Sequence, residues 1–277
     1  MTASLPDPRT SPYRADLAAA HLEGIVPADR FVEGVPCQIR AGFATVKGSP
    51  DFEARQTTQA LFGETVTVYE EHDGWVWGQL SGDGYVGYLR LDTLWGETPE
   101  PTHQVTALRS FLFPEPDLKT PPLDVLSLTT RVAAAGERNG FVELAQGGWV
   151  FARHLADLAA HQRDHAATSR RLLGVPYLWG GKTSLGLDCS GLVQIALAAA
   201  GIAAPRDSDQ QGGTLGRPVP EGETLRSGDL VFFPGHVGIM TGPEHLIHAN
   251  AFHMMVTEEP LSDVVARGAR ITGIRRL

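Results

Sequence analysis

Three residues have the types and positions that cysteine-based hydrolysis requires, and Cys189 is the first of them. It begins the apolar run CSGLVQIALAAA (189–200), whose spacing predicts a helix with Asp188 at its N-cap and Gly201 just beyond its end. The first turn of a helix offers free N–H groups and the positive end of the helix dipole, which favour a thiolate over a thiol. A purely structural cysteine more often lies in the middle of a helix. The sequence therefore predicts that Cys189 is a nucleophile.

Two histidines lie on neighbouring predicted strands. His236 opens one strand in SGDLVFFPGHVGIM (227–240), and His248 lies twelve positions later in EHLIHANAF (244–252), a spacing that places them side by side in an antiparallel pair. A thiol nucleophile needs an imidazole to take its proton, and that imidazole needs a partner on its other nitrogen. We expect His236 to be the base and His248 the group that orients it. The chain has ten histidines, so this spacing alone leaves a non-catalytic pair as an alternative.

Bulk composition limits the classes of partner. The 277 residues suffice for two or three domains, and the net charge of −9 comes without any cluster of Lys and Arg. Nucleic acids and anionic membrane surfaces are bound mainly by clustered positive charge, so neither is an expected partner. No signal peptide is recognisable at residues 1–24, and no apolar stretch approaches the roughly 18 residues of a membrane span. We expect a cytoplasmic monomer without a cofactor or metal.

A repeated pattern indicates two small β modules ahead of the catalytic region. Residues 64–94 contain aromatic strands separated by the turns Asp73-Gly74 and Asp83-Gly84. Residues 131–158 repeat this order, with turns at 139–140 and 147–148. Proline-rich segments at 98–102 and 114–122 are typical of a linker and a long loop. Residues 1–29 are expected to form an arm that packs on the other modules, with a short helical pattern at 15–23.

Five short motifs, in order and spacing, resemble those of the NlpC/P60 family of cell-wall peptidases. They are YLWGG (177–181), LDCSGLVQ (187–194), PRDSDQQ (205–211), SGDLVFFPGHVGIM (227–240) and LIHA (246–249). The resemblance implies a papain-like fold reduced to a helix that carries the Cys and a small antiparallel sheet that carries both His. It also identifies Cys189, His236 and His248 as the family's catalytic residues.

The repeated β pattern resembles the bacterial SH3 modules, small barrels of five strands, that precede the peptidase in one subgroup of the family. The predicted fold class is therefore α+β, with a papain-like NlpC/P60 catalytic domain preceded by two small all-β SH3-like barrels. The predicted domains are an N-terminal arm (1–29), a first SH3-like domain (30–98), a second SH3-like domain (99–158) and the peptidase domain (159–277).

The family resemblance extends the site around the nucleophile. Tyr177 resembles the family's Tyr whose hydroxyl lies at the edge of the site and assists the oxyanion, together with the backbone N–H of Cys189. A tyrosine that only packs in the core beside Trp179 is the alternative. Asp188 and Ser190 resemble residues that line the substrate groove, although Asp188 would also serve simply as a helix cap.

The same resemblance implies where specificity is set. Arg206, Asp207 and Ser208 match the segment that receives the unblocked end of a murein stem peptide, where the acidic residue pairs with the free amine of L-Ala and the serine binds γ-D-Glu. In the subgroup, the first SH3 module contributes a Tyr and sometimes an acidic residue to the subsites. Tyr85 matches that Tyr and Glu53 is the candidate for the acid, with ordinary core packing as the alternative for Tyr85.

The resemblance predicts a cysteine endopeptidase, specifically a dipeptidyl peptidase. It would cut the bond between γ-D-Glu and a diamino acid (meso-diaminopimelate or L-Lys) in murein peptides with a free N-terminal L-Ala, release L-Ala-γ-D-Glu and so recycle cell-wall peptides. Two alternatives stay open. One is a murein-binding SH3-type protein with a degenerate peptidase domain, and the other is a papain-like amidase or transferase that acts on another amide.

Overall fold

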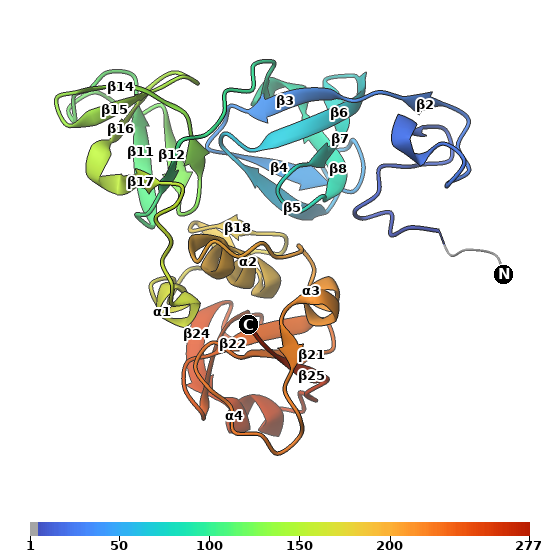
Figure 1. The fold of residues 1–277 in the computed structure, drawn as a ribbon, viewed down its shortest axis with the longest axis vertical. Coiled ribbons are helices and arrows are strands. Elements are labelled where there is room, and N and C mark those ends of the chain that lie inside the picture. Colours follow the sequence, from blue (N-terminus) through green and yellow to red (C-terminus); the bar gives the residue numbers. More distant parts are fainter. Residues whose placement is uncertain (1–4) are drawn as a thin grey trace. The chain divides into compact units, whose positions relative to one another are not determined.

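The computed structural model describes residues 5–277, so residues 1–4 of the predicted N-terminal arm lie outside the described residues (Figure 1). The chain forms two compact units. The first contains Met1–His103, Phe111–Leu126 and Thr130–Arg153, and the second contains Gln104–Ser110, Ser127–Thr129 and His154–Leu277. Two short segments that precede residue 154 in the chain thus belong to the unit that carries the predicted catalytic residues.

The first β region of unit 1 is a seven-stranded antiparallel sheet in the order β5-β4-β8-β7-β6-β3-β9. Its strands are β3 (Val35–Ile39), β4 (Phe43–Lys47), β5 (Gln56–Leu61), β6 (Thr65–His72), β7 (Trp75–Leu80), β8 (Val86–Arg90) and β9 (Leu94–Trp95). The predicted turn Asp73-Gly74 joins β6 to β7, with positive φ at both residues. The sheet has more than the five expected strands partly because the two-residue β9 pairs with β3.

The N-terminal segment is not the helix that the pattern at 15–23 predicts. Ala18 and Ala19 form the short strand β1 (Ala18–Ala19), which pairs in parallel with β2 (Phe31–Val32), and only Ala20–Leu22 form a 3-10 helix. A nine-residue helix is marginal by itself, so strand pairing and burial decide the conformation. The backbone N–H of Val86 donates to the carbonyl of Arg9 at 2.8 Å, which ties this segment to β8.

The second β region repeats the predicted turns. Strands β12 (Asp124–Ser127), β11 (Arg109–Phe113), β16 (Trp149–Phe151), β15 (Phe141–Leu144) and β14 (Ala134–Arg138) follow one another in a five-stranded sheet. Positive φ at Asn139, Gly140, Gly147 and Gly148 forms the tight turns on either side of β15. The proline-rich segment 114–122 is the expected long loop between β11 and β12. The remaining strands are β10 (His103–Val105), β13 (Arg131–Val132) and β17 (Leu155–Asp157).

Unit 2 is built on a six-stranded antiparallel sheet in the order β20-β25-β21-β22-β23-β24. The strands are β20 (Arg217–Pro218), β21 (Leu230–Phe233), β22 (His236–Met240), β23 (His245–Asn250), β24 (Met255–Pro260) and β25 (Gly273–Arg276). The helices are α1 (His165–Arg170), α2 (Cys189–Ala199), α3 (Ser208–Thr214) and α4 (Leu261–Ala266). Strands β18 (Lys182–Thr183) and β19 (Gly186–Leu187) form a small hairpin.

Alternation along β21 separates the two apolar faces of this sheet. Leu230 and Phe232 belong to a buried cluster that includes most of α2, whereas Val231 and Phe233 belong to a second cluster that includes Val264 of α4. The sheet thus lies between α2 and α4, as Figure 1 shows. Because both faces are covered, the short strands that carry the two histidines have little freedom to move.

Helix α2 begins and ends as the sequence predicts. The Asp188 side chain accepts a hydrogen bond from the backbone N–H of Gly191 at 2.7 Å, and Gly201 follows the helix with a φ of +77°. Among residues 5–277 no helix is long and apolar enough to cross a membrane.

Candidate active site

Cys189 is the first residue of α2 and its side chain is buried. Burial raises the pKa of the Cys189 thiol to about 11, and the charge of Asp188 acts in the same direction, while the backbone N–H groups of Val237 and Ser190 oppose it. Burial thus opposes the thiolate that the helix start is expected to favour, because desolvation outweighs the N–H groups in the resting site. The thiol needs a base to become a nucleophile.

The two histidines lie side by side, as their spacing predicts. His236 begins β22 directly after Gly235, whose φ is +67°, and its Nε2 lies 2.8 Å from Nδ1 of His248 on β23. Burial and, to a smaller extent, the proximity of His248 lower the pKa of His236 to about 4. At neutral pH the His236 ring is thus uncharged and can accept a proton.

Cys189 and His236 come from elements that pack on each other. Helix α2 packs on β22, and the Cys189 sulfur accepts a hydrogen bond from the backbone N–H of Val237, the residue that follows His236. The Nε2 atom of His236 is engaged by His248. Nδ1 is therefore the nitrogen of His236 that can take the thiol proton.

A third group, which the sequence analysis missed, continues this line of side chains. The Nε2 atom of His248 lies 2.8 Å from Oε1 of Glu259 on β24. In the β23–β24 pair, Thr257 lies opposite His248, and Glu259 is two residues further on the same face. The available signal was the acidic pair at 258–259 on the strand after LIHA, but the register needed to choose between the two is not visible in a sequence.

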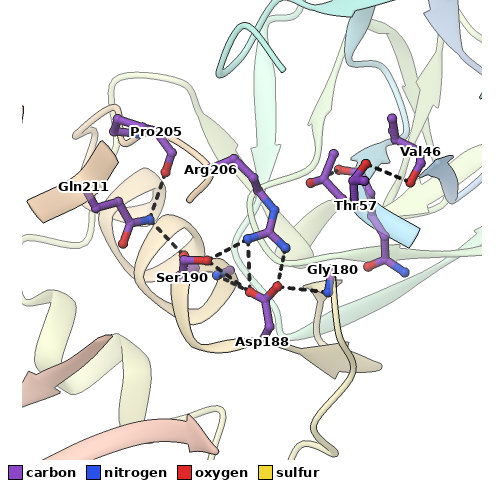
Figure 2. Close-up of polar contacts among 11 residues, drawn as sticks. Val46, Thr57, Gly180, Asp188, Ser190, Pro205, Arg206 and Gln211 are labelled. Carbon is purple, nitrogen blue, oxygen red and sulfur yellow. Dashed lines mark hydrogen bonds and ion pairs between the residues drawn. The ribbon is translucent and has the colours of Figure 1, made fainter. Parts of the chain in front are cut away.

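Asp188, Arg206 and Ser190 form one buried polar network (Figure 2). The guanidinium of Arg206 donates to both carboxylate oxygens of Asp188, at 3.0 and 2.6 Å, and to the Ser190 hydroxyl at 2.8 Å. Arg206 is only 1% exposed. The structure brings these three predicted substrate residues together, with polar atoms of each directed at the others.

Asp188 also holds the loop that precedes the helix. Its carboxylate accepts a hydrogen bond from the backbone N–H of Gly180 at 2.9 Å, which Figure 2 shows beside the arginine pair. The loop comes so close to α2 that a Cβ at position 191 would overlap the carbonyl oxygen of Gly181. Glycine at 191 is therefore required for this contact. One carboxylate thus caps the helix, pairs with Arg206 and fixes the loop that carries Tyr177.

Tyr177 lies at the edge of this region and is half-buried. Its backbone N–H donates to the carbonyl of Met254 at 2.9 Å, and the residue packs against the core cluster that contains Cys189. Burial, together with the proximity of Cys189 and Asp188, raises the pKa of the Tyr177 hydroxyl to about 12. The hydroxyl therefore keeps its proton and can donate a hydrogen bond at neutral pH.

Asp207 and Ser208 stand at the start of α3. Asp207 occupies the N-cap position and Ser208 is the first helical residue. Gln211 of this helix donates to the carbonyl of Ser190 at 3.1 Å and to that of Pro205 at 2.8 Å, so α3 is tied to α2. Ser208 also lines a cavity of about 550 Å³ whose wall includes the segment that leads into His236, namely Phe233, Pro234 and Gly235.

The remaining predicted site residues belong to unit 1. Tyr85 is 6% exposed and lies in the core cluster of the seven-stranded sheet, and its backbone N–H donates to Asp83. Glu53 is exposed in the turn after β4, and its backbone N–H donates to Asp51. The core position of Tyr85 matches the packing alternative, and the proposed site roles of both residues stay predictions.

The described residues carry no disulfide at the two cysteines, since Cys37 and Cys189 are both free thiols. Within residues 5–277 no three His, Cys, Asp or Glu side chains are grouped as metal ligands.

Comparisons with known proteins place these features in a family. Residues 174–271 match the NlpC/P60 family, and residues 48–94 match the bacterial dipeptidyl-peptidase SH3 domain. The NlpC/P60 match contains Cys189, His236, His248 and the Asp188–Arg206 network. The SH3 match lies within the seven-stranded sheet.

Similar proteins support the same assignment. The chain is 30% identical over 237 residues to a gamma-D-glutamyl-L-lysine dipeptidyl-peptidase of Bacillus cereus. The matched region covers 74% of this chain and 70% of the relative. It is 26% identical to dipeptidyl-peptidase 6 of Lysinibacillus sphaericus, over 76% of this chain and 86% of the relative. A crystal structure of an NlpC/P60 family protein from Bacillus cereus superposes with a TM-score of 0.76 at 25% identity, covering 87% of this chain and 99% of the other. The chain is therefore a peptidase of the NlpC/P60 family with a bacterial SH3 domain ahead of its peptidase region.

Proposed function

We propose that Cys189, His236 and His248 are the catalytic residues, as nucleophile, base and orienting group. The observation that carries this proposal is the arrangement of the three side chains. The sulfur contacts the backbone N–H of Val237, and the ring of the preceding residue, His236, is engaged by His248 at 2.8 Å through its other nitrogen. A nucleophile, a base and a group on the far side of the base are the parts that thiol catalysis needs.

The reaction would proceed through a thioester. His236 takes the proton of Cys189, the sulfur attacks the scissile carbonyl, and the resulting imidazolium protonates the departing amine as the C–N bond breaks. Water, deprotonated by His236, then attacks the thioester and releases the carboxylic acid and the thiol. The Tyr177 hydroxyl and the backbone N–H of Cys189 are the proposed donors to the oxyanion, since the raised pKa of Tyr177 keeps its proton in place.

The proposed substrate is a murein stem peptide with a free N-terminal L-Ala, cut between γ-D-Glu and the diamino acid. The names of the Bacillus cereus and Lysinibacillus sphaericus relatives, a gamma-D-glutamyl-L-lysine dipeptidyl-peptidase and a dipeptidyl-peptidase, support this class of bond and product. Asp207 would pair with the amine of L-Ala and Ser208 would bind γ-D-Glu. Ser208 lines the cavity whose wall includes Gly235, the residue before His236, and this cavity is the proposed place for that part of the peptide.

Arg206, Asp188 and Ser190 would serve the substrate indirectly. Arg206 precedes Asp207, and its guanidinium is bound to the residue that precedes Cys189, at 2.6 Å from one carboxylate oxygen. The pair thus links the proposed amine-binding segment to the nucleophile helix. We propose that this link keeps the distance between amine and nucleophile at the length of one dipeptide, which would make the enzyme a dipeptidyl peptidase.

The proposed domain organisation is an N-terminal arm (1–29), two bacterial SH3-like barrels (30–98 and 99–158) and a papain-like peptidase domain (159–277). In support, both β regions have a tight turn before an aromatic strand, at 73–74 and 139–140. Tyr85 and Glu53 are the proposed contributions of the first SH3-like domain to the subsites beyond L-Ala.

We propose a role in recycling murein peptides, with the cytoplasm as the place of action. A free L-Ala amine exists only on stem peptides already detached from the glycan, so specificity for it directs the enzyme to released peptides. The two free thiols suit a reducing compartment.

Hydrolysis of L-Ala-γ-D-Glu-L-Lys and of its N-acetylated form, followed by mass spectrometry, tests the proposal. We expect release of L-Ala-γ-D-Glu from the free peptide and a kcat/KM lower by about 100-fold for the acetylated one, because the carboxylate of Asp207 loses its cationic partner. Cys189→Ala should lower kcat by about 10⁴-fold or more. Cys37→Ala is the matched control, a cysteine of the other unit, and should retain full activity.

Two results would contradict the proposal. Full activity of Cys189→Ala would show that Cys189 is not the nucleophile. Equal cleavage of the free and acetylated peptides would show that Asp207 does not bind the amine of L-Ala. The same assay with meso-diaminopimelate in place of L-Lys shows which diamino acid is preferred.

A further inference from the structure

We propose that Glu259 is a positioning residue that sets the tautomer of His248 and, through it, the tautomer of His236. The inference rests on the proposed function, in which His236 is the base. It concerns a carboxylate outside the three proposed catalytic residues.

Glu259 is held in place from two sides. Its Oε1 lies 2.8 Å from Nε2 of His248, across the β23–β24 pair. Arg267, which directly follows α4, donates to both carboxylate oxygens, from Nη1 to Oε2 at 2.8 Å and from Nη2 to Oε1 at 2.6 Å. This two-point contact fixes the plane of the carboxylate, so the acceptor that faces His248 has a defined direction.

The carboxylate is ionised throughout the working range of pH. Burial raises the pKa of Glu259, but the hydrogen bonds from Arg267 and His248 lower it more, to about 2. An ionised carboxylate only accepts hydrogen bonds. The Nε2 atom of His248 must therefore carry a hydrogen.

The protonation of both rings follows from that hydrogen. A neutral His248 with hydrogen on Nε2 presents Nδ1 as an acceptor. The partner of Nδ1 is Nε2 of His236 at 2.8 Å, so this nitrogen must be the donor. A neutral His236 with hydrogen on Nε2 has its lone pair on Nδ1, the nitrogen that takes the proton of Cys189. The opposite tautomer of His248 would donate to His236 and place the hydrogen of His236 on Nδ1, which would abolish the base.

Burial keeps His248 neutral, and the positive charge of Arg267 acts in the same direction. A lone carboxylate beside His248 would favour the imidazolium, which donates from both nitrogens and reverses the hydrogen bond to His236. Burial lowers the pKa of His248, Glu259 raises it, and Arg267 lowers it again. The other charged or titratable groups near this carboxylate are His253, 3.7 Å from Oε2, and Asp263, which interacts with Arg267.

The neighbouring residue on the same strand provides a matched control. Glu258 points to the other face of β24, where it pairs with Arg170 of α1 at 2.6 Å and accepts a hydrogen bond from Thr241. It has the same side chain and an equivalent arginine partner, but its hydrogen bonds run to Arg170 and Thr241 rather than to His236 or His248. Glu258→Gln thus removes a carboxylate charge and an arginine pair from β24, as Glu259→Gln does, but it leaves the hydrogen bond to His248 in place.

The test compares Glu259→Gln with Glu258→Gln in the full chain. Nitrogen NMR of the histidine rings should show hydrogen on Nε2 of both His236 and His248 in the wild type and in Glu258→Gln. In Glu259→Gln the amide can donate to His248, so we expect a mixture of tautomers. With L-Ala-γ-D-Glu-L-Lys as substrate, kcat should fall about tenfold in Glu259→Gln with KM changed less than twofold, and it should stay within twofold in Glu258→Gln.

Unchanged tautomers or a kcat within threefold of the wild type in folded Glu259→Gln would overturn the inference, as would an equal fall in Glu258→Gln. Thermal unfolding of both variants shows whether they are folded. A wild-type chain that does not cut the peptide would refute the proposed function instead, and the NMR comparison would still decide the role of Glu259.

Discussion

The two sides of the proposed site are each held by a carboxylate–arginine pair, and the two pairs differ in burial. On the nucleophile side, the side chains of Arg206 and Asp188 are 1% and 10% exposed. On the base side, those of Arg267 and Glu259 are 30% and 12% exposed. In both pairs the guanidinium contacts both carboxylate oxygens. The same carboxylate–guanidinium contact is therefore fully buried on one side of the proposed site and partly exposed on the other.

The difference in burial predicts that one pair mainly stabilises the fold and the other mainly affects the reaction. A buried pair cannot lose one partner without leaving an uncompensated charge in the protein interior, whereas a partly exposed pair can exchange its partner for water. Asp188–Arg206 should thus be mainly structural, holding α2, the loop before it and the start of α3 together. Glu259–Arg267 should matter little for folding and act mainly through His248.

The largest expected effect is on the buried pair. Asp188→Asn keeps a side chain that can cap α2 but removes the charge opposite Arg206, which contacts no solvent through which to compensate. We expect the free energy of unfolding to fall by about 3–5 kcal/mol, as measured by urea denaturation. Glu258→Gln, which breaks the more exposed pair with Arg170, is the control and should cost less than about 1 kcal/mol. Similar losses of stability in Asp188→Asn and Glu258→Gln would show that burial does not make the Asp188–Arg206 pair more important for folding than the Glu258–Arg170 pair.

The elements around the proposed site that the sequence predicted correctly are those whose signal is local. The helix that begins at Cys189 was predicted because an apolar run between Asp188 and Gly201 defines a helix with a cap at each end. The strands that carry His236 and His248 were predicted because alternation and the two turns define adjacent strands. Each of these signals spans fewer than about 20 residues, which is the range over which periodicity and turn chemistry operate.

The residues that were missed or misjudged depend on tertiary structure. Glu259 and Arg267 act through the register of β23 and β24 and through the end of α4, and a period of two does not reveal register. Arg206 was placed in the substrate segment by the resemblance of PRDSDQQ, and its burial against Asp188, 18 positions away, is not visible in that motif. The helical pattern at 15–23 failed because strand pairing with β2 outweighs the propensity of a short segment.

An intermediate effect is expected from pH on the base side. The pKa of His236 is about 4 in the folded chain, against an ordinary value of 6.5 that applies when the chain is unfolded. Between these values the unfolded chain binds a proton that the folded chain does not. The stability is therefore complete above pH 6.5 and is lost as the pH falls toward 4, by an amount on the order of 3 kcal/mol.

Urea denaturation at pH 7 and pH 4.5 measures this loss, and His236→Gln should show a smaller one. Asp16, Asp229, Glu258 and Glu259 have carboxylates with a lowered pKa. Their contribution to stability is lost mainly below this window, where the carboxylates of the unfolded chain take up protons that those of the folded chain do not. The comparison between wild type and His236→Gln thus isolates the imidazole. An identical loss of stability in both chains would mean that His236 takes up a proton as readily in the folded chain as in the unfolded one.

The smallest effect on stability is expected at Arg267, where the effect on pH dependence should nevertheless be clear. Arg267→Met should lower the free energy of unfolding by less than about 1 kcal/mol, because its side chain is 30% exposed. It also removes a positive charge that lowers the pKa of His248 while Glu259 continues to raise it. The imidazolium of His248 then forms at higher pH, so the acid limb of the kcat/KM profile should move upward.

Arg170→Met is the matched change on the other face of β24, since it removes the partner of Glu258 instead. Its pH profile should coincide with that of the wild type, with a similarly small loss of stability. If the acid limb moves in both variants, the cause is a general loss of positive charge near the strand. If it moves in neither, His248 is insensitive to Arg267, and the carboxylate–arginine pair on the base side would be structural like the one on the nucleophile side. A shift confined to Arg267→Met would show that Glu259–Arg267 differs in role from Asp188–Arg206. A change that is nearly neutral for folding would then alter the protonation of His248, on which the proposed base depends.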